Sequence, residues 1–360
     1  MNAIIEKTNT GKLLAVILAV AVAIVGMAVV LSDNVEATEP VSLNAEGFMG
    51  LADEETGVIK LENDVMLTET VTLNESITID LNGFTLSSDD SVTNMFYNAG
   101  GENGAVAGTT NVDLTIDGTT ANSTIDASKR ITFFRAADCD LTINGGKYIS
   151  GDFAFIWYSV SGSTTTTVNV TDADVKGQTS AFWLRNGPIA NATFTNCDIT
   201  TSGLGIYIGT VQNTVITDCN ITATGEDSAI EIKAGSVSID GCNISAAYYK
   251  ESTVTGSSSS SDSVSAIVIN SAYSSVAGTE EVEVDITDSK ITNSAEGSKA
   301  IILISNEGDA PLDVAWEGHG SDDFAVTGGN TEGVTISENP DRDFSNSVTY
   351  GDGAIIDADS

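Results

Sequence analysis

Apolar and polar residues alternate in short segments that recur along the chain with nearly the same pattern. Each segment reads apolar, polar, apolar, polar, then Asp, Asn or Gly, a small residue, a polar residue and an apolar residue. Alternation with a period of two predicts β-strands, and a repeat of 22 to 27 residues between the first five segments predicts a solenoid of stacked strands. The segments are LTINGGKYI (141–149), VNVTDADV (168–175), ATFTNCDI (192–199), VITDCNI (215–221), VSIDGCNI (237–244) and VDITDSKI (284–291).

A second strand is expected about a dozen residues after each first strand. These second segments are short, apolar and rich in β-branched and aromatic residues, as strands are. They read AFIWY (154–158), AFWL (181–184), GIYI (205–208), AIEI (229–232), AIVI (266–269) and AIILI (300–304). Gly, Ser, Asn and Asp fill the gaps, which predicts tight turns, and no helical stripe of useful length follows residue 31. Folds in which long helices separate the strands are therefore excluded.

The N-terminal part of the pattern carries a family resemblance. Residues 57–86, GVIKLENDVMLTETVTLNESITIDLNGFTL, form a succession of alternating segments. The ITIDLNGFTL segment and the ITDCNI-type segments resemble right-handed parallel β-helix proteins of the pectin-lyase-like superfamily, over residues 57–304. The resemblance implies an all-β, right-handed parallel β-helix solenoid. It implies little about function, because this fold hosts lyases, hydrolases, adhesins and surface-layer proteins.

The chain is expected to be organised around this solenoid. Residues 13–31 lack charge and follow Lys7 and Lys12, so an N-terminal hydrophobic helix serves as a signal peptide or a membrane anchor and exports the rest. A Ser-rich loop insertion, 246–263, explains the double step between the last two repeats. The expected parts are the signal peptide or anchor (1–37), a linker (38–56), the β-helix (57–306) and a C-terminal strand-rich cap or tail (307–360).

The charge of the chain narrows the choice of partners. The formal net charge is −37, with 14 basic and 51 acidic residues. Such a surface repels nucleic acid and anionic polysaccharide and attracts divalent cations. We expect no nucleic-acid partner, membrane contact only through residues 13–31, and no cofactor, with weak surface calcium as the one open alternative.

Two positions of the repeat predict columns of like residues. Cys197, Cys219 and Cys242 occupy one inward position of three consecutive units, which favours a stack of buried thiols over disulfides or a metal site. Asp or Asn recurs at the preceding turn position, where its side chain bonds nearby backbone N–H groups and tolerates a left-handed conformation. That column comprises Asp172, Asn196, Asp218 and Asp288, with Gly145 and Gly241 in register.

Catalytic motifs are weak. The single histidine, His319, lies in Gly-His-Gly, a tripeptide also found in polygalacturonases, but the paired aspartates that should precede it are absent. Pectate lyases use an Arg or Lys base beside a calcium cluster. The candidate bases Arg130, Arg135, Arg185 and Lys233 do not fall in a recognisable pattern with clustered aspartates.

Two kinds of binding or modification site remain. Aromatic residues on successive second strands either fill the core or line an outer face that stacks on sugars, for which the candidates are Tyr158, Trp183 and Tyr207. Asn-x-Ser/Thr sequences are candidate glycosylation sites, and alternation places Asn169, Asn220 and Asn243 on the outside. The candidate acceptors are Asn74, Asn169, Asn220 and Asn243.

The sequence thus predicts an extracellular, cell-surface structural or adhesin-like protein without catalytic activity. The leader and the acidic body rich in Thr, Ser and Asn are similar to envelope proteins of archaea. Its partners would be cell-envelope or surface glycans, or further copies of itself. A polysaccharide-binding or polysaccharide-degrading enzyme, and a subunit of a surface lattice or filament, stay open as alternatives.

Overall fold

The computed structural model describes most of the chain beyond its N-terminal segment. Side chains are described in residues 39–98, 112–134, 139–158, 166–185, 189–250, 263–270, 282–298 and 300–303, and the backbone alone at residue 304 and in short strands up to residue 350. Contacts divide the chain into Met1–Pro40 and Val41–Ser360. The predicted signal or anchor helix lies outside the described residues. Among those that are described, no helix is both long enough and apolar enough to cross a membrane.

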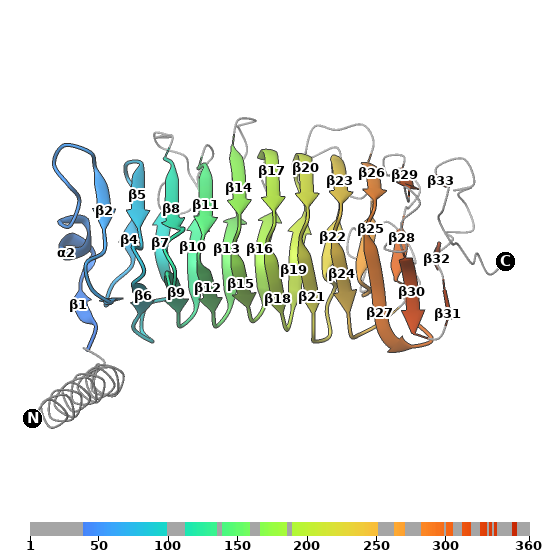
Figure 1. Ribbon diagram of the computed structural model, residues 1–360, viewed down its shortest axis with the longest axis horizontal. Coiled ribbons are helices and arrows are strands. Elements are labelled where there is room, and N and C mark those ends of the chain that lie inside the picture. Colours follow the sequence, from blue (N-terminus) through green and yellow to red (C-terminus); the bar gives the residue numbers. More distant parts are fainter. Residues whose placement is uncertain are drawn as a thin grey trace, which may run out of the picture. The chain divides into compact units, whose positions relative to one another are not determined.

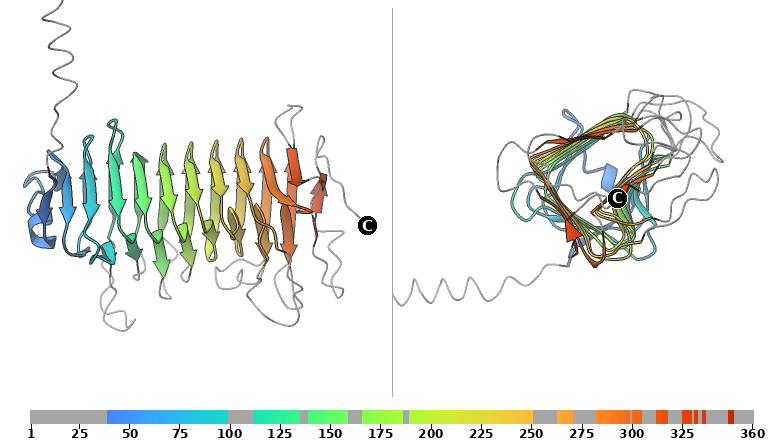
Figure 2. Two further views of the ribbon diagram at one scale, coloured as in Figure 1. Left: turned by 90° about the horizontal axis from the view of Figure 1, so that it is seen from below. Right: turned by 90° about the vertical axis from the view of Figure 1, so that its right-hand side faces the viewer.

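The second unit is an all-β parallel solenoid with three faces. In the described part of the chain, successive strands go in turn to three sheets of 11, 12 and 10 strands, which we name B, A and C. The strands of each sheet lie side by side along the axis (Figure 1), and the view along that axis shows the faces of one coil (Figure 2). Neighbours pair in parallel, apart from the antiparallel pair β30–β31.

Sheet B contains the strands that end in the Asp, Asn or Gly turn. They are β2 (Val58–Lys60), β5 (Ile77–Asp80), β8 (Leu114–Gly118), β11 (Leu141–Gly145), β14 (Thr167–Thr171), β17 (Ile189–Thr195), β20 (Val211–Thr217), β23 (Ser236–Asp240), β26 (Val282–Thr287), β29 (Leu312–Glu317) and β33 (Val348–Tyr350).

Sheet A contains the strands that follow that turn. They are β1 (Val41–Leu43), β3 (Val65–Leu67), β6 (Thr85–Ser88), β9 (Thr124–Ala127), β12 (Lys147–Ser150), β15 (Asp174–Gly177), β18 (Asp198–Thr201), β21 (Asn220–Ala223), β24 (Asn243–Ala246), β27 (Lys290–Glu296), β30 (Ala325–Gly329) and β31 (Thr331–Glu332).

Sheet C contains the apolar second strands. They are β4 (Val71–Thr72), β7 (Asn94–Asn98), β10 (Arg130–Phe134), β13 (Phe153–Tyr158), β16 (Ser180–Arg185), β19 (Leu204–Ile208), β22 (Ile230–Ile232), β25 (Ile267–Asn270), β28 (Ile301–Ile304) and β32 (Thr335–Ile336).

In-register stacking turns the alternation of the sequence into continuous columns. On sheet C, Phe155 pairs with Phe182 and Phe182 with Ile206, and all three side chains are fully buried. Phe155 and Phe182 stack with ring centroids 5.0 Å apart. The alternate residues point outward, so one face of each strand builds the core and the other builds the surface.

The turn from sheet B to sheet A repeats with the predicted conformation. Asp172, Asn196, Asp218 and Asp288 have φ of 55°, 51°, 53° and 44°. The left-handed region is one that Asn and Asp tolerate better than other side chains. The Asn196 side-chain amide also donates to Asp172 Oδ1 at 2.5 Å. The column is therefore built into the fold.

The residue after each turn faces inward, as the sequence predicts. Cys197, Cys219 and Cys242 are each 1 % exposed and are free thiols. The N–H of Cys197 donates to Cys219 Sγ, and that of Cys219 to Cys242 Sγ, both at 3.4 Å. The thiol contact with Cys197 lowers the pKa of Cys219, but the contact with Cys242 and burial together raise it to about 12, so the thiol stays protonated at neutral pH.

The segment predicted to be a linker (38–56) contains regular structure. It holds β1 and the short helix α2 (Ala45–Met49), which begins where Asn44 Oδ1 accepts the Gly47 N–H at 2.8 Å. Phe48 is fully buried, with its ring 6.1 Å from that of Phe96. The segment thus caps the N-terminal end of the core.

The described ends of the predicted loop insertion are packed. Tyr249 lies against Val268 and Ile302, which face outward on sheet C yet are fully buried. Lys250 and Val264 form an antiparallel bridge that closes the insertion. Residues 251–262, including the Ser run, lie outside the described residues.

Candidate functional site

Aromatic side chains gather on the outer face of sheet C. The outward column along the axis runs through Tyr97, Phe133, Ile156, Trp183 and Tyr207, paired strand to strand. Phe153 and Tyr158 flank it on β13. We name Tyr97, Phe133, Phe153, Tyr158, Trp183 and Tyr207 the aromatic strip.

The rings of the strip contact one another in two runs. Tyr97 stacks on Phe133 and Phe133 on Tyr158, with centroids 5.9 and 6.0 Å apart. Trp183 and Tyr207 stack at 4.3 Å with an interplanar angle of 11°. Phe153 meets Trp183 edge-on at 5.5 Å and extends the second run. Each ring supports the next, which fixes the strip in one arrangement.

Cations lie on this strip. The Arg130 guanidinium is 5.7 Å from the centroids of both Phe133 and Phe153, and its Nε bonds Asp152 at 2.8 Å. Arg185 lies 5.8 Å from the Trp183 ring, and Lys233 Nζ lies 5.3 Å from that of Tyr207. Three of the candidate bases therefore share one face, while Arg135 lies outside the described residues.

An ion pair closes one end of the strip. Lys233 Nζ lies 2.9 Å from Glu231 Oε1, and the two side chains are 6 % and 15 % exposed. Burial raises the pKa of Glu231, although Lys233 opposes that shift. Burial also raises the pKa of nearby Asp227. Both carboxyl groups therefore hold a proton to higher pH than a fully exposed carboxyl group does.

The three predicted stacking residues have different accessibility. Tyr158 is 44 % exposed and Trp183 is partly exposed, so both are open to a ligand. Tyr207 points outward as predicted but is only 3 % exposed, which removes it as a stacking surface. Its ring lies across Gly209, where a Cβ would come within 2.4 Å of Tyr207 Cε1. Tyr207 therefore contributes by stacking against the Trp183 ring and holding it in place.

Tyr97, Phe133 and Phe153 belong to the strip although the sequence pattern did not single them out. A signal was present, because NMFYN and RITFF precede AFIWY at the corresponding place in the repeat. Their contacts, Tyr97 with Phe133 and Phe153 with Trp183, join residues of neighbouring strands, which a pattern within one strand does not show.

The predicted glycosylation acceptors all lie on the surface. Asn74, Asn169, Asn220 and Asn243 are exposed. Asn220 and Asn243 are in-register neighbours on sheet A, and the Asn243 side-chain amide donates to Asn220 Oδ1 at 3.1 Å. Accessibility meets the first requirement for modification, which itself stays a prediction.

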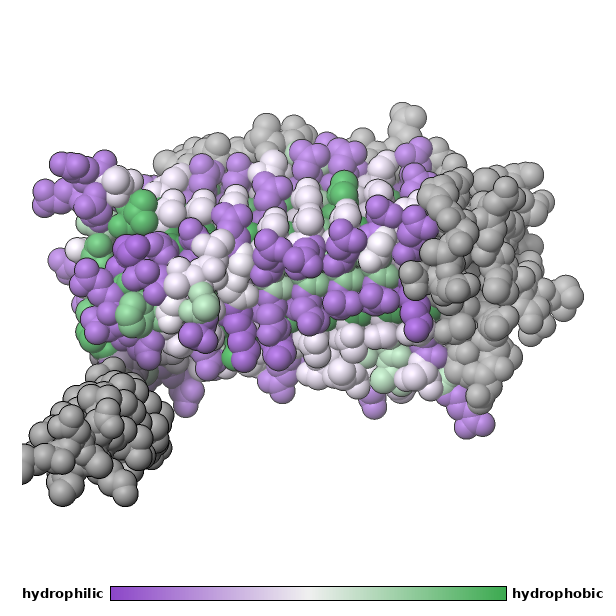
Figure 3. Space-filling model, in the orientation of Figure 1, coloured by the Kyte–Doolittle hydropathy of each residue, from purple (hydrophilic) through white to green (hydrophobic). Residues whose placement is uncertain are grey.

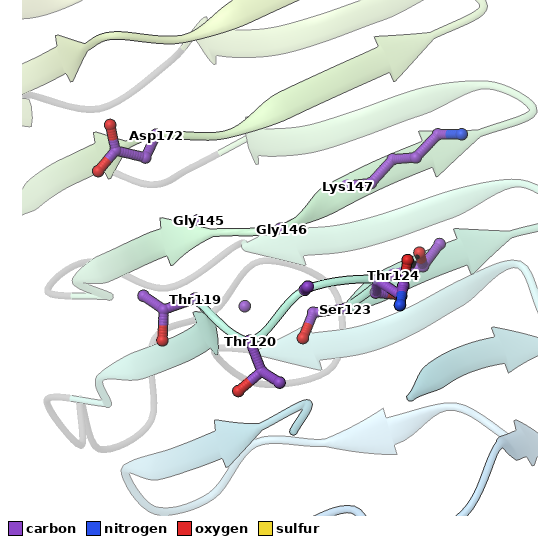
Figure 4. Close-up of a pocket in the computed structure, with 11 residues that line it drawn as sticks. Thr119, Thr120, Ser123, Thr124, Gly145, Gly146, Lys147 and Asp172 are labelled. Atoms are coloured by element: carbon purple, nitrogen blue, oxygen red, sulfur yellow. Dashed lines mark hydrogen bonds between the residues drawn. The ribbon is translucent and has the colours of Figure 1, made fainter. Parts of the chain in front are cut away.

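Other candidate sites gain no support from the described residues. His319 lies outside them, and within them no three His, Cys, Asp or Glu side chains converge as metal ligands. A pocket of about 540 Å³ lies on the turns between sheets B and A. Figure 4 shows its lining, with Gly145 and Gly146 on one turn and Thr119, Thr120 and Ser123 on the neighbouring turn. It lacks a buried charged side chain and an aromatic surface.

Replacing Asp227 by asparagine should make stability less dependent on pH. Burial raises the pKa of Asp227 in the folded chain, so its contribution to stability is present at low pH and is lost as pH rises through that value. Asparagine keeps the acceptor that Asp227 Oδ1 offers to the Ser228 N–H at 2.9 Å. Asp227→Asn should gain up to about 1 kcal/mol over wild type toward neutral pH. Urea midpoints from acidic to neutral pH measure the difference, and parallel curves would contradict the assignment.

Comparison of the chain with protein-family models, with curated proteins and with solved structures finds no match.

Proposed function

We propose that this chain is an exported cell-surface structural or adhesin-like protein that binds surface saccharides on the outer face of sheet C without cleaving them. The observation that carries the proposal is the aromatic strip, in which Tyr158 and Trp183 remain open while other rings hold them in place. Ring faces pack against the C–H faces of sugars, and stacked aromatics held in place bind at low entropic cost.

The other faces of the solenoid support a surface role. The view onto sheets A and B is dominated by hydrophilic and pale residues in rows along the axis (Figure 3). A rigid coil with polar faces and one aromatic face presents a ligand in a fixed direction. Export through residues 13–31, a right-handed coil and kinship with the pectin-lyase-like superfamily belong to this proposal.

Saccharide binding by the full-length chain tests the proposal. Neutral oligosaccharides should quench or shift tryptophan fluorescence, and Trp183→Ala should weaken binding by about tenfold or more, because a stacked ring contributes about 1 kcal/mol or more. Val215→Ala is the matched control, since Val215 is 41 % exposed on sheet B. Absence of binding to a broad saccharide panel, or equal binding by the Trp183 variant, contradicts the proposal.

One observation favours a second function, a polysaccharide-degrading enzyme. Glu231 and Asp227 both have raised pKa values, and glycoside cleavage uses one carboxyl group as an acid beside a second carboxylate. We expect no turnover. Release of reducing or unsaturated ends from a polysaccharide, lost in Glu231→Gln, would replace the binding proposal by this one.

A further inference from the structure

We infer that Arg185, together with Tyr158 and Trp183, forms an anion subsite that selects a saccharide carrying one isolated carboxylate or sulfate group. The inference rests on the proposed function, because it names the ligand class of the same face. It goes beyond that function by assigning a specificity residue.

Arg185 is placed beside both open rings of the strip. It ends β16 and pairs in register with Tyr158 of β13, while its guanidinium carbon lies 5.8 Å from the Trp183 ring centroid. A sugar stacked on either ring would therefore have its ring substituents next to the guanidinium group.

The hydrogen bonding of Arg185 is incomplete. Its Nε is buried and has no acceptor among the residues that the structure describes. Arg130, the other arginine that the structure describes, also lies on aromatic rings of this face but bonds Asp152 through the same atom. Glu231 is close enough for Arg185 to affect its pKa, yet its ion pair is with Lys233. Among the described residues, the Nε of Arg130 thus has a carboxylate partner and the Nε of Arg185 does not.

This deficiency calls for an external acceptor. A buried N–H without a partner costs free energy, and charged groups cost more than neutral ones. The chain has 51 acidic residues, so a carboxylate partner for Arg185 could readily come from the chain itself. The planar guanidinium fork matches carboxylate and sulfate oxygens bidentately. Arg185 as a whole is partly exposed, so a ligand oxyanion would meet the accessible part of its guanidinium group, and it would reach the covered Nε only if the side chain shifts.

The negative charge of the whole chain limits how many anionic groups a bound ligand can carry. The net charge of −37 repels every charge on the ligand, whereas the contact with Arg185 is made once. Repulsion therefore grows with ligand charge and exceeds the single contact for a dense polyanion. A neutral chain with one acidic residue obtains the contact at the smallest electrostatic cost.

Four probes measured on the full-length protein test the inference. They are a neutral oligosaccharide, the same oligosaccharide with one uronic acid, the same with one sulfate ester, and polygalacturonate. We expect at least one mono-anionic probe to bind about tenfold more tightly than the neutral one, the scale of one charge-assisted hydrogen bond. The uronate and sulfate arms then tell which group is recognised. Polygalacturonate should bind more weakly than the preferred mono-anionic probe.

Substitutions assign the preference to Arg185. Arg185→Gln should remove the advantage of the anionic probe over the neutral one, and Arg185→Lys should restore that advantage in part. Lys176→Gln removes the same charge from an exposed position on sheet A and should change neither affinity. Thermal melts of all variants establish that they fold.

The outcomes of these measurements distinguish failure of this inference from failure of the proposed function. Equal affinity of wild type for neutral and mono-anionic probes, with binding still dependent on Trp183, overturns the anion subsite alone. Preference for the polyanion, or a preference that Arg185→Gln retains, also overturns it. No binding of any probe overturns both.

Discussion

Cys219→Asp is expected to prevent folding. The Cys219 side chain is 1 % exposed and stacks between Cys197 and Cys242, so an aspartate there buries a charge without a cation in the core. Cys219→Ala should cost only about 1 kcal/mol, because one small group is lost. Cys219→Leu should cost about 1–3 kcal/mol, because adjacent strands only about 4.8 Å away leave no space.

Denaturation midpoints of the three variants measure this order. Val215→Asp is the matched control, because Val215 lies on β20 just before the same turn but is 41 % exposed, and its variant should fold. If aspartate at 219 is tolerated as well as alanine, the side chain does not face a closed core. The inward and outward assignments of every strand would then need revision.

Alanine substitutions at two adjacent residues of β16 should reduce stability by different amounts. Phe182 is fully buried between Phe155 and Phe194, with centroids 5.0 and 4.9 Å away, so Phe182→Ala should cost about 3–5 kcal/mol. Trp183 points outward and loses mainly its stack with Tyr207, so Trp183→Ala should cost about 1–2 kcal/mol. The binding of saccharide should follow the reverse order.

Chemical denaturation and saccharide titration of both variants check this contrast. Phe182→Leu, which refills most of the space, should recover stability and retain binding. Equal stability losses in the two alanine variants would mean that the outer face is as closed as the core. The separation of fold and binding between alternate residues would then be wrong.

The alternating segments were sufficient to predict the strands and the direction of their side chains. In Val237–Ile244, the inward positions are apolar and the outward ones polar, and only one register buries the first set. The turn column was predictable for a local reason as well. Asp218 needs no distant partner to adopt positive φ, because its own side chain tolerates that conformation.

The remaining features depend on contacts between repeats. The helix α2 has five residues, too few to establish a helical period, and its position follows from Phe48 reaching the open end of the core. Tyr207 is buried although it faces outward, because Gly209, just after its strand, and Trp183 on the neighbouring strand leave a space that its ring fills. Neither cause is visible within one segment.

The cap formed by α2 also affects how unfolding begins at the N-terminal end of the solenoid. In a solenoid each coil contacts only its neighbours. A terminal coil has one neighbour instead of two, so unfolding is expected to begin at an end and to proceed one coil at a time. Phe48 holds the N-terminal end closed by covering Phe96. Mechanical load applied at residue 41 would first pull β1 away from β3 and would then meet the contact of Phe48 with Phe96, so these two contacts in series would resist the first step of unfolding from this end.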